Sequence, residues 1–349
     1  MIYDIAVIGG GPAGATFARL AADSGKSIVL INGQDIRGKK PCGGLLAPDT
    51  QKALAHMDLV LPVNVLADPQ IFSVKTVDVC KKTIRYYPRH YINVDRAAFD
   101  KWLISLVPES VDKISGVCLN IERNSEYFNV TVKTVGGENK IKAKNIIGAD
   151  GASSIVRRTF YGDKIYHYTA IQQWFKTTAK AKPFYSCVFD PETSESCSWS
   201  VFKDGYFIFG GCFKPQNCRE AFEKQKERLK GFDGFDFENC VKTEACLALR
   251  PRKMNDFITG DNGVYLIGEA AGFISPSSFE GISYAIKTGH MLAEIFKSGN
   301  ENIGVKYASA VKGIKLKLML KTVKRWVMYT PFAREIIMKT GVGSIELWK

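Results

Sequence analysis

The chain has 349 residues, a formal net charge of +13, and 46% hydrophobic and 11% aromatic residues. This length suits one large domain or two moderate ones, and the apolar content allows a sizeable core. The nine cysteines are odd in number and contain no C-x-x-C pair, which argues against a zinc-ligand set or a disulfide framework and favours a reducing compartment. With no signal peptide and no apolar run long enough to span a bilayer, the sequence predicts a cytoplasmic protein.

Residues 4–32 predict a strand, a glycine-rich turn, a helix and a second strand. Gly9, Gly11 and Gly14 have the G-x-G-x-x-G spacing: the first allows a tight turn, the second a close approach to a pyrophosphate, and the third helix–strand packing. The helix is expected to begin at Pro12 and to present the N-terminal end around Ala13 to phosphate oxygens. The sequence therefore predicts a dinucleotide site, and the alternative is a glycine-rich turn without a ligand.

Asn32 ends the second predicted strand, where an acidic residue usually holds a ribose hydroxyl. An asparagine amide can also hydrogen-bond a hydroxyl, and Asp35 lies close in sequence. We predict that Asn32 contacts the ribose.

Further along the chain, residues 49–57 predict a helix, and residues 71–79 and 84–92 alternate as strands do. Residues 115–135 predict a hairpin, and a second hairpin turn is expected at Gly136 and Gly137. Residues 145–148 predict a short buried strand, residues 165–213 a strand-rich region, and residues 219–230 a charged surface helix. Another helix is expected to open at Gly281 and Ile282, after a turn at residues 268–272.

The order of these elements predicts an α/β fold, in which a Rossmann-like dinucleotide-binding domain is interleaved with a mixed β-sheet domain. The expected dinucleotide-binding domain comprises residues 1–60, 90–165 and 255–300. The mixed β-sheet domain comprises residues 61–89 and 166–254, and residues 301–349 form a basic C-terminal helical segment.

Four motifs resemble those of FAD proteins in the aromatic hydroxylase and geranylgeranyl reductase superfamily: residues 9–14, Arg96 with Phe99-Asp100, residues 148–157, and residues 268–282. The Lys40-Pro41-Cys42-Gly43-Gly44 stretch is similar to the geranylgeranyl reductase branch. Residues 40–48, 69–78, 170–175 and 203–211 resemble the bacterial CbrA-type oxidoreductases. The usual Asp of the last motif is Glu269 here, and the usual Gly before Glu280 is Phe279.

The resemblance implies that the dinucleotide-binding domain is an FAD-binding domain of the glutathione reductase or aromatic hydroxylase type, and that the mixed β-sheet domain binds the substrate. It also implies noncovalent FAD and places Cys42, Gly43 and Gly44 beside the flavin ring. The helix start at Gly281 and Ile282 would favour negative charge on reduced flavin. Arg96 and Lys40 could reach phosphate or ribityl oxygens, although a solvated surface charge is the favoured reading for Lys40. Asp150 is expected either beside the pyrophosphate or in a purely structural turn. The full set of predicted cofactor-binding residues is Gly9, Gly11, Pro12, Ala13, Gly14, Asn32, Lys40, Cys42, Gly43, Gly44, Arg96, Val117, Asp150, Gly268, Glu269, Pro276, Gly281 and Ile282.

Cys42 is the candidate catalytic residue, as a proton donor, although a small apolar side chain without a catalytic role is the favoured reading. Trp174, Trp199 and Tyr206 could line an apolar substrate site, with core packing as the equal alternative. No metal site is expected. The predicted reaction is reduction of carbon–carbon double bonds in an isoprenoid or other apolar substrate, with NAD(P)H or another reductant binding transiently. The alternatives are a flavin monooxygenase acting on an aromatic substrate and a flavin-binding protein without turnover.

The basic excess is concentrated at the C-terminus, because residues 305–349 hold ten Lys or Arg and two Glu, a net charge of +8. Residues 306–328 mix seven basic side chains with apolar ones and Trp326, a pattern typical of helices that lie on anionic lipid. One reading is a peripheral position on the inner face of the membrane, from which a lipid substrate could enter. The favoured reading is a helix that packs its apolar face on the domain, with its lysines solvated. Nucleic acid is not an expected partner.

Overall fold

The computed structural model describes residues 1–34, 40–162, 165–178, 180–299 and 301–345. They form two compact units, each assembled from segments that are far apart in the sequence. Unit 1 contains Met1–Lys40, Ala97–Tyr166 and Leu249–Leu320, and unit 2 contains Pro41–Arg96, His167–Ala248 and Lys321–Lys349.

Unit 1 is built on an eight-stranded sheet with the order β16-β17-β10-β1-β2-β7, which the β8–β9 hairpin extends from β10. Its strands are β1 (Ile2–Ile8), β2 (Ile28–Asn32), β7 (Val111–Ser115), β8 (Val117–Arg123), β9 (Phe128–Thr134), β10 (Gly137–Gly148), β16 (Gly260–Asp261) and β17 (Val264–Leu266). β1 runs parallel to both β10 and β2. Residues 5–8 of β1 are at most 3% exposed, as expected for an apolar run in a parallel sheet.

The helices of unit 1 include α1 (Pro12–Ala21), α5 (Ile155–Tyr161), α7 (Ile282–Lys297) and α8 (Ile303–Ala310), with α4 (Arg96–Ser105) beginning at its boundary. α1 and α7 approach closely because Gly289 has no side chain: a Cβ there would lie 2.5 Å from the Ala13 carbonyl oxygen. Phe17 and Phe296 pack edge to face across the same contact, with ring centroids 5.6 Å apart.

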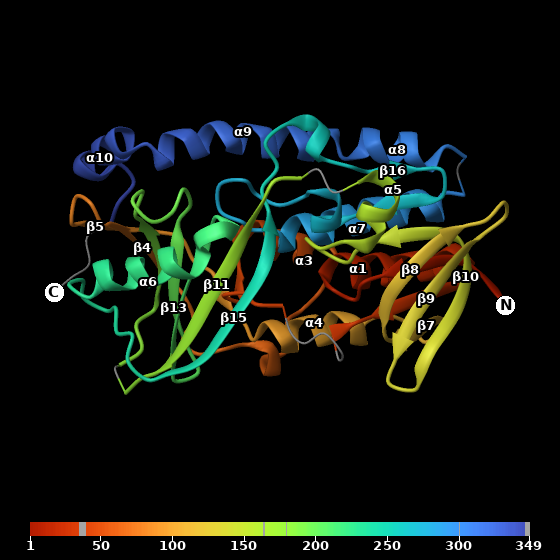
Figure 1. The fold of residues 1–349 in the computed structure, drawn as a ribbon, viewed down its shortest axis with the longest axis horizontal. Helices are drawn as coiled ribbons and strands as arrows, with labels where there is room; N and C mark the ends of the chain where they lie inside the picture. The colour runs from red at the N-terminus through yellow and green to blue at the C-terminus, as the bar shows by residue number, and fades with distance from the viewer. Residues whose placement is uncertain (35–39, 163–164, 179, 300, 346–349) are drawn as a thin grey trace. The chain divides into compact units, whose positions relative to one another are not determined.

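β10 is longer than the short buried strand predicted at residues 145–148, because it pairs with two kinds of partner. Its first half is the return strand of a hairpin and runs antiparallel to β9, with exposed lysines at alternate positions. Its second half, which is buried, runs parallel to β1 and β17. Figure 1 shows β8, β9 and β10 side by side in yellow.

Unit 2 is built on a seven-stranded sheet with the order β15-β11-β14-β13-β12-β4-β5. Its strands are β4 (Ser73–Asp78), β5 (Thr83–Tyr87), β11 (His167–Lys176), β12 (Phe184–Phe189), β13 (Ser198–Lys203), β14 (Tyr206–Phe213) and β15 (Cys240–Leu249). β3 (Leu45–Leu46) pairs with β6 (Ile92–Asn93), and the helices include α3 (Pro48–His56), α6 (Cys218–Leu229) and α10 (Pro331–Thr340). The strand predicted over residues 84–92 is interrupted, since Pro88 has no N–H for a ladder.

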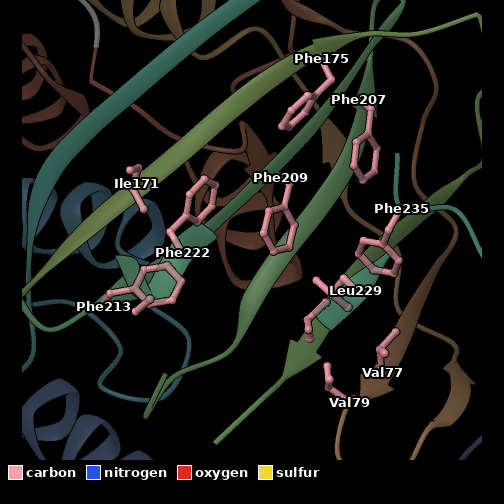
Figure 2. Packing of buried hydrophobic residues seen from close by; sticks show 12 residues of the cluster. Val77, Val79, Ile171, Phe175, Phe207, Phe209, Phe213, Phe222, Leu229 and Phe235 are labelled. Carbon is pink, nitrogen blue, oxygen red and sulfur yellow. The ribbon is translucent and has the colours of Figure 1, made fainter. Parts of the chain in front are cut away.

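The two faces of this sheet carry different residues. Side chains from alternate positions, including Phe175, Phe207 and Phe209, form a phenylalanine-rich core with Phe222 and Leu229 of α6 (Figure 2). α6 is therefore half buried rather than only a charged surface helix. The opposite face carries Trp174, Val201 and Ile208, which pack with Ile71 and Tyr91.

The predicted α/β fold class, with a dinucleotide-type sheet, a mixed β-sheet and C-terminal helices, is confirmed. α9 (Lys312–Tyr329) is divided between the units at Leu320. In the part of the chain that the structure describes, no helix combines the length and the apolar character needed to cross a bilayer.

Candidate functional site

In unit 1, the glycine turn between β1 and α1 has the geometry that its spacing predicts. Gly9 has φ +112°, and a Cβ there would lie 2.5 Å from the Ala149 carbonyl oxygen. A Cβ on Gly14 would overlap the Gly9 carbonyl oxygen, so α1 can lie against the turn only with glycine at this position. A Cβ on Gly11 would have no atom within 4 Å. Gly9 and Gly14 are thus required by the fold itself, whereas Gly11 faces open space.

The N-terminus of α1 is suited to an anion. Pro12 is its first residue, Gly11 is its N-cap, no side chain caps it, and its first turn has no acidic residue. The N–H groups and the positive end of the helix dipole therefore face the open space beside Gly11. A pyrophosphate group fits this donor set.

A small cavity of about 40 Å³ lies at the carboxyl ends of the strands that flank the turn. Its lining residues are Ile8, Gly9, Ile31, Gly33, Gly116, Val117, Cys118, Asp150 and Ile155. The predicted residues Gly9, Val117 and Asp150 thus come together. Because β1 lies between β2 and β10, this is the crevice where open α/β sheets bind ligands.

Asp150 has one oxygen engaged and one without a partner. Its Oδ2 accepts the Ile155 N–H at 2.7 Å, while Oδ1 is buried with no hydrogen bond. Burial raises the pKa of this carboxyl group, although hydrogen bonds from Ser154 and Ile155 oppose the shift. A buried acceptor at the rim of the turn fits a hydroxyl-bearing cofactor, since an unmet acceptor is costly.

Asn32 lies against the glycine turn. A Cβ on Gly10 would lie 2.7 Å from Asn32 Oδ1, and this oxygen accepts the Gln34 N–H at 3.2 Å. The amide nitrogen of Asn32 is the group available to a ribose oxygen. Asp35 lies outside the residues that the structure describes.

Lys40 and Glu269, two predicted cofactor ligands, form an ion pair with each other. Glu269 Oε1 also accepts the Leu249 N–H at 3.1 Å, and its neighbour Gly268, at φ +59°, donates its N–H to Thr288 Oγ1 at 2.9 Å. Lys40 and the Leu249 N–H therefore each hold one oxygen of the Glu269 carboxylate within unit 1. Lys40 is half exposed, in line with the surface reading that the sequence favoured, but it has an acidic partner.

α7 begins as predicted at Ile282, with Gly281 as its N-cap, no side-chain cap and no acid in its first turn. Arg250 is fully buried nearby and donates from Nε to the Pro276 carbonyl oxygen at 3.0 Å. Phe279, which replaces the usual glycine, has φ +55° and so adopts the left-handed backbone that the glycine would allow. Its ring lies 5.4 Å from the Arg250 guanidinium.

In unit 2, the loop that contains Cys42, Gly43 and Gly44 is fastened by a buried lysine. Lys203, which is 3% exposed and ends β13, donates from Nζ to the Gly43 carbonyl oxygen at 2.8 Å and the Val94 carbonyl oxygen at 2.6 Å. The Gly44 N–H points to Cys42 Sγ at 3.4 Å, and Gly44 accepts the Val94 N–H at 2.8 Å. Sequence reasoning missed Lys203.

The charges around Cys42 change its acidity. Burial by itself would raise the pKa of the Cys42 thiol, but the Arg96 guanidinium, the Gly44 N–H and the Lys203 ammonium outweigh it, and the net pKa is lowered. Burial lowers the pKa of Lys203 to about 8, against the opposing attraction of Cys42 and Asp95. Arg96 therefore lies beside the Cys42 thiol, whereas the sequence predicted that it could contact a phosphate or ribityl oxygen.

Trp199 lies next to this loop. A Cβ on Gly43 would be 3.6 Å from Trp199 Nε1, and this buried indole nitrogen has no hydrogen-bond partner. Trp174 and Tyr206 form an edge-to-face pair with centroids 5.8 Å apart, and Trp174 Nε1 donates to Glu244 Oε2 at 2.8 Å. Strand register puts all three rings on the face of the sheet that also carries Lys203. The predicted substrate residues therefore share one surface.

The predicted residues divide between the two units. Those of unit 1 are Gly9, Gly11, Pro12, Ala13, Gly14, Asn32, Lys40, Val117, Asp150, Gly268, Glu269, Pro276, Gly281 and Ile282, and those of unit 2 are Cys42, Gly43, Gly44, Arg96, Trp174, Trp199 and Tyr206. Besides Lys203, the sequence reading missed Arg250 and Thr288. The signal for Arg250 in the sequence was weak, because it is the first of three cations, with Arg252 and Lys253, that follow the apolar residues 247–249.

Comparison with known proteins agrees with the geometry of unit 1. Residues 2–298 match the family model described as FAD binding domain. Protein CbrA from Escherichia coli strain K12 is 44% identical over 352 residues, which cover 99% of each chain.

Two solved structures share the fold at low identity. A geranylgeranyl bacteriochlorophyll reductase-like protein from Thermoplasma acidophilum has a TM-score of 0.77 at 18% identity, over 96% of this chain and 90% of that one. The p-nitrophenol 4-monooxygenase PnpA from Pseudomonas putida DLL-E4 has a TM-score of 0.72 at 14% identity, over 98% of this chain and 94% of that one. With the glycine turn, the uncapped helix and the unmet Asp150 oxygen, these matches lead to one conclusion: the chain belongs to the FAD-binding domain family of oxidoreductases, and it is a full-length relative of the bacterial CbrA proteins.

Proposed function

We propose that this protein is a geranylgeranyl reductase-like enzyme that reduces carbon–carbon double bonds of an isoprenoid or similar apolar substrate. The observation that supports this most directly is the cluster of Cys42, Lys203 and Trp199. Reduction of an alkene needs a hydride at one carbon and a proton at its neighbour. The Cys42 thiol, whose pKa is lowered and which lies near a buried ammonium and an indole ring, can supply that proton in an apolar setting.

In this proposal, bound FAD in its reduced form supplies the hydride. Cys42 gives its proton to the neighbouring carbon and becomes a thiolate, which the Arg96 guanidinium and the Lys203 ammonium stabilise. Lys203 then returns a proton to the sulfur. Trp199, Trp174 and Tyr206 bind the apolar chain and exclude water. The electrons for the cofactor would come from NAD(P)H or another two-electron reductant that binds transiently.

The FAD site is tested by a matched pair of glycine variants. A side chain on Gly11 meets no protein atom within 4 Å, and its φ of −71° suits any residue, so Gly11→Val should fold normally and yet lose flavin. Gly14→Val should lower the free energy of unfolding itself, because its Cβ would overlap the Gly9 carbonyl oxygen. Flavin absorbance and urea unfolding separate the two effects. If folded Gly11→Val kept its full flavin content, the pyrophosphate could not lie beside Gly11, and the proposed position would be wrong.

The reaction is tested under argon with the dithionite-reduced holoenzyme and geranylgeraniol as the polyene. We expect flavin reoxidation on addition of the polyene and a product that has gained two hydrogen atoms. Cys42→Ala should slow this step by about 10²–10⁴-fold, the usual contribution of a positioned acid. Cys218→Ala, at a half-buried cysteine on α6, is the control and should react at the wild-type rate.

Two other outcomes would contradict the proposal. A hydroxylated aromatic product with stoichiometric O₂ uptake would make the protein a monooxygenase. Flavin whose oxidation rate is unchanged by polyene or aromatic substrates would make it a flavin-binding protein without turnover.

A further inference from the structure

The outward face of α9 is apolar, which is unusual for a surface helix. Leu316, Leu320, Val323 and Trp326 are 58%, 62%, 62% and 70% exposed. Their spacing of four, three and three residues places them on one side of the helix. We call these four residues the exposed stripe.

The stripe is not the side by which α9 packs. Leu318 is fully buried, and Tyr329 accepts the Cys197 N–H at 2.9 Å while its ring lies 5.3 Å from that of Phe189. α9 therefore packs against the rest of the protein through residues outside the exposed stripe. The exposed stripe remains as apolar surface in contact with water, which carries a free-energy cost.

α10, which follows Thr330, also exposes large apolar side chains. Phe332 is 73% and Ile336 48% exposed, while Arg334 and Met338 of the same helix are buried. Arg334 is anchored by the Asp78 carboxylate at 2.6 Å. α10 is thus fixed to unit 2 by one face and presents large apolar side chains on the other. Figure 1 shows α9 and α10 as consecutive blue helices.

The charge of α9 points to the kind of partner. The helix contains five Lys, one Arg and no acidic residue. The Lys315 stem is partly buried, and its Nζ donates to the Phe257 carbonyl oxygen at 3.3 Å. Lys312 and Lys317 are exposed beside the stripe. The side chains of Lys324 and Val327 lie outside the part of the chain that the structure describes.

We propose that α9 and α10 dock this protein on an anionic lipid surface, with the exposed stripe and Phe332 inserted at the level of the head groups. Lysines around an apolar stripe with an interfacial Trp complement such a surface in both charge and polarity. A second copy of the chain fits less well, because two copies of α9, each without an acidic residue, would repel each other. The helices lie on the bilayer, since they lack the apolar length to span it.

The experiment sediments the full-length holoenzyme with vesicles of phosphatidylcholine alone or with one third phosphatidylglycerol. We expect binding to the anionic vesicles, about tenfold or more weaker binding to the neutral ones, and release as salt rises. Each Lys→Gln change at Lys312 or Lys317 should weaken binding about fivefold. Trp326→Ser with Leu320→Ser should abolish binding and leave flavin content unchanged.

Val135→Ser is the matched control, since Val135 is a 95% exposed apolar residue at the β9–β10 turn. It should bind vesicles as the wild type does. Equal binding to both vesicle types, or none to either, would overturn the proposal. So would a concentration-dependent dimer, seen by analytical ultracentrifugation, that Trp326→Ser with Leu320→Ser dissociates, because the stripe would then be an interface between copies of the chain.

Discussion

Replacing Lys203 with methionine tests the electrostatics of the candidate site in unit 2. The change keeps most of the side-chain length but removes the ammonium that contacts the Gly43 and Val94 carbonyl oxygens. Burial lowers the pKa of Lys203 from 10.5 to about 8 in the folded protein. Between these two pH values, the unfolded chain binds more protons at this residue than the folded chain does.

Stability therefore rises with pH in this window, because the cost of burying the charge disappears as the ammonium deprotonates. The difference between the two pKa values corresponds to on the order of 3 kcal/mol. Between pH 7 and pH 11, the free energy of unfolding of the wild type should rise by that amount relative to that of Lys203→Met. Below pH 8 the penalty is fully present, and above pH 10.5 it is gone.

The assay is urea unfolding at several pH values, in a Cys42→Ala background so that the neighbouring thiol does not titrate. Lys176→Met, at an exposed lysine that ends β11 of the same sheet, is the control and should differ from the wild type by less than about 0.5 kcal/mol at each pH. A wild-type advantage over Lys203→Met that stays constant or shrinks as pH rises would refute the assignment of Lys203 as a buried ammonium.

Two further predictions concern stability. Arg334→Met leaves the fully buried Asp78 carboxylate without its partner and should lower the free energy of unfolding by about 3–5 kcal/mol. Lys81→Met breaks a solvent-exposed pair with Glu335 and should have a much smaller effect. Chemical denaturation measures both variants, and similar losses would contradict the reasoning. Phe279→Gly should be more stable than Phe279→Ala by about 1–2 kcal/mol. Both variants lose the ring, but only glycine adopts the left-handed backbone at φ +55° without steric strain. A higher melting temperature for Phe279→Ala in thermal unfolding would contradict this.

The features that the sequence predicted well are local ones. The glycine spacing, the helix start at Pro12 and the second strand all lie within the first 32 residues, where each residue's conformation depends on near neighbours. The same holds for the start of α7 at Ile282. Because these motifs carry their geometry in their spacing, the residue pattern alone is enough to place the glycine turn and the beginning of α7.

The features that the sequence did not predict depend on partners that are far away along the chain. Lys203 precedes Asp204 and Gly205, a typical hairpin turn, so it looks like a solvated lysine, yet its two acceptors lie 160 and 109 residues away. Lys40 and Glu269, separated by 229 residues, were assigned to a cofactor and not to each other. The sequence predicted the hairpin turn at Gly136 and Gly137 and the buried strand at residues 145–148, but not that β10 is continuous between them, because its hairpin half lacks the apolar run that marks its buried half.

The contact between α1 and α7 has a consequence for folding during synthesis. Ala13, beside the glycine turn, meets Gly289, so the parts of this contact leave the ribosome about 276 residues apart. Until α7 has emerged, the apolar side of α1 has no packing partner, and Phe17 in particular lacks Phe296. β1 lacks its neighbour β10 for about half of the time that the stretch from Ala13 to Gly289 takes to be made. Such long-range pairing is slow and leaves apolar surface open to aggregation. Truncated chains that end before α7 should therefore depend on chaperones, and the cofactor can be captured only when most of the chain is complete.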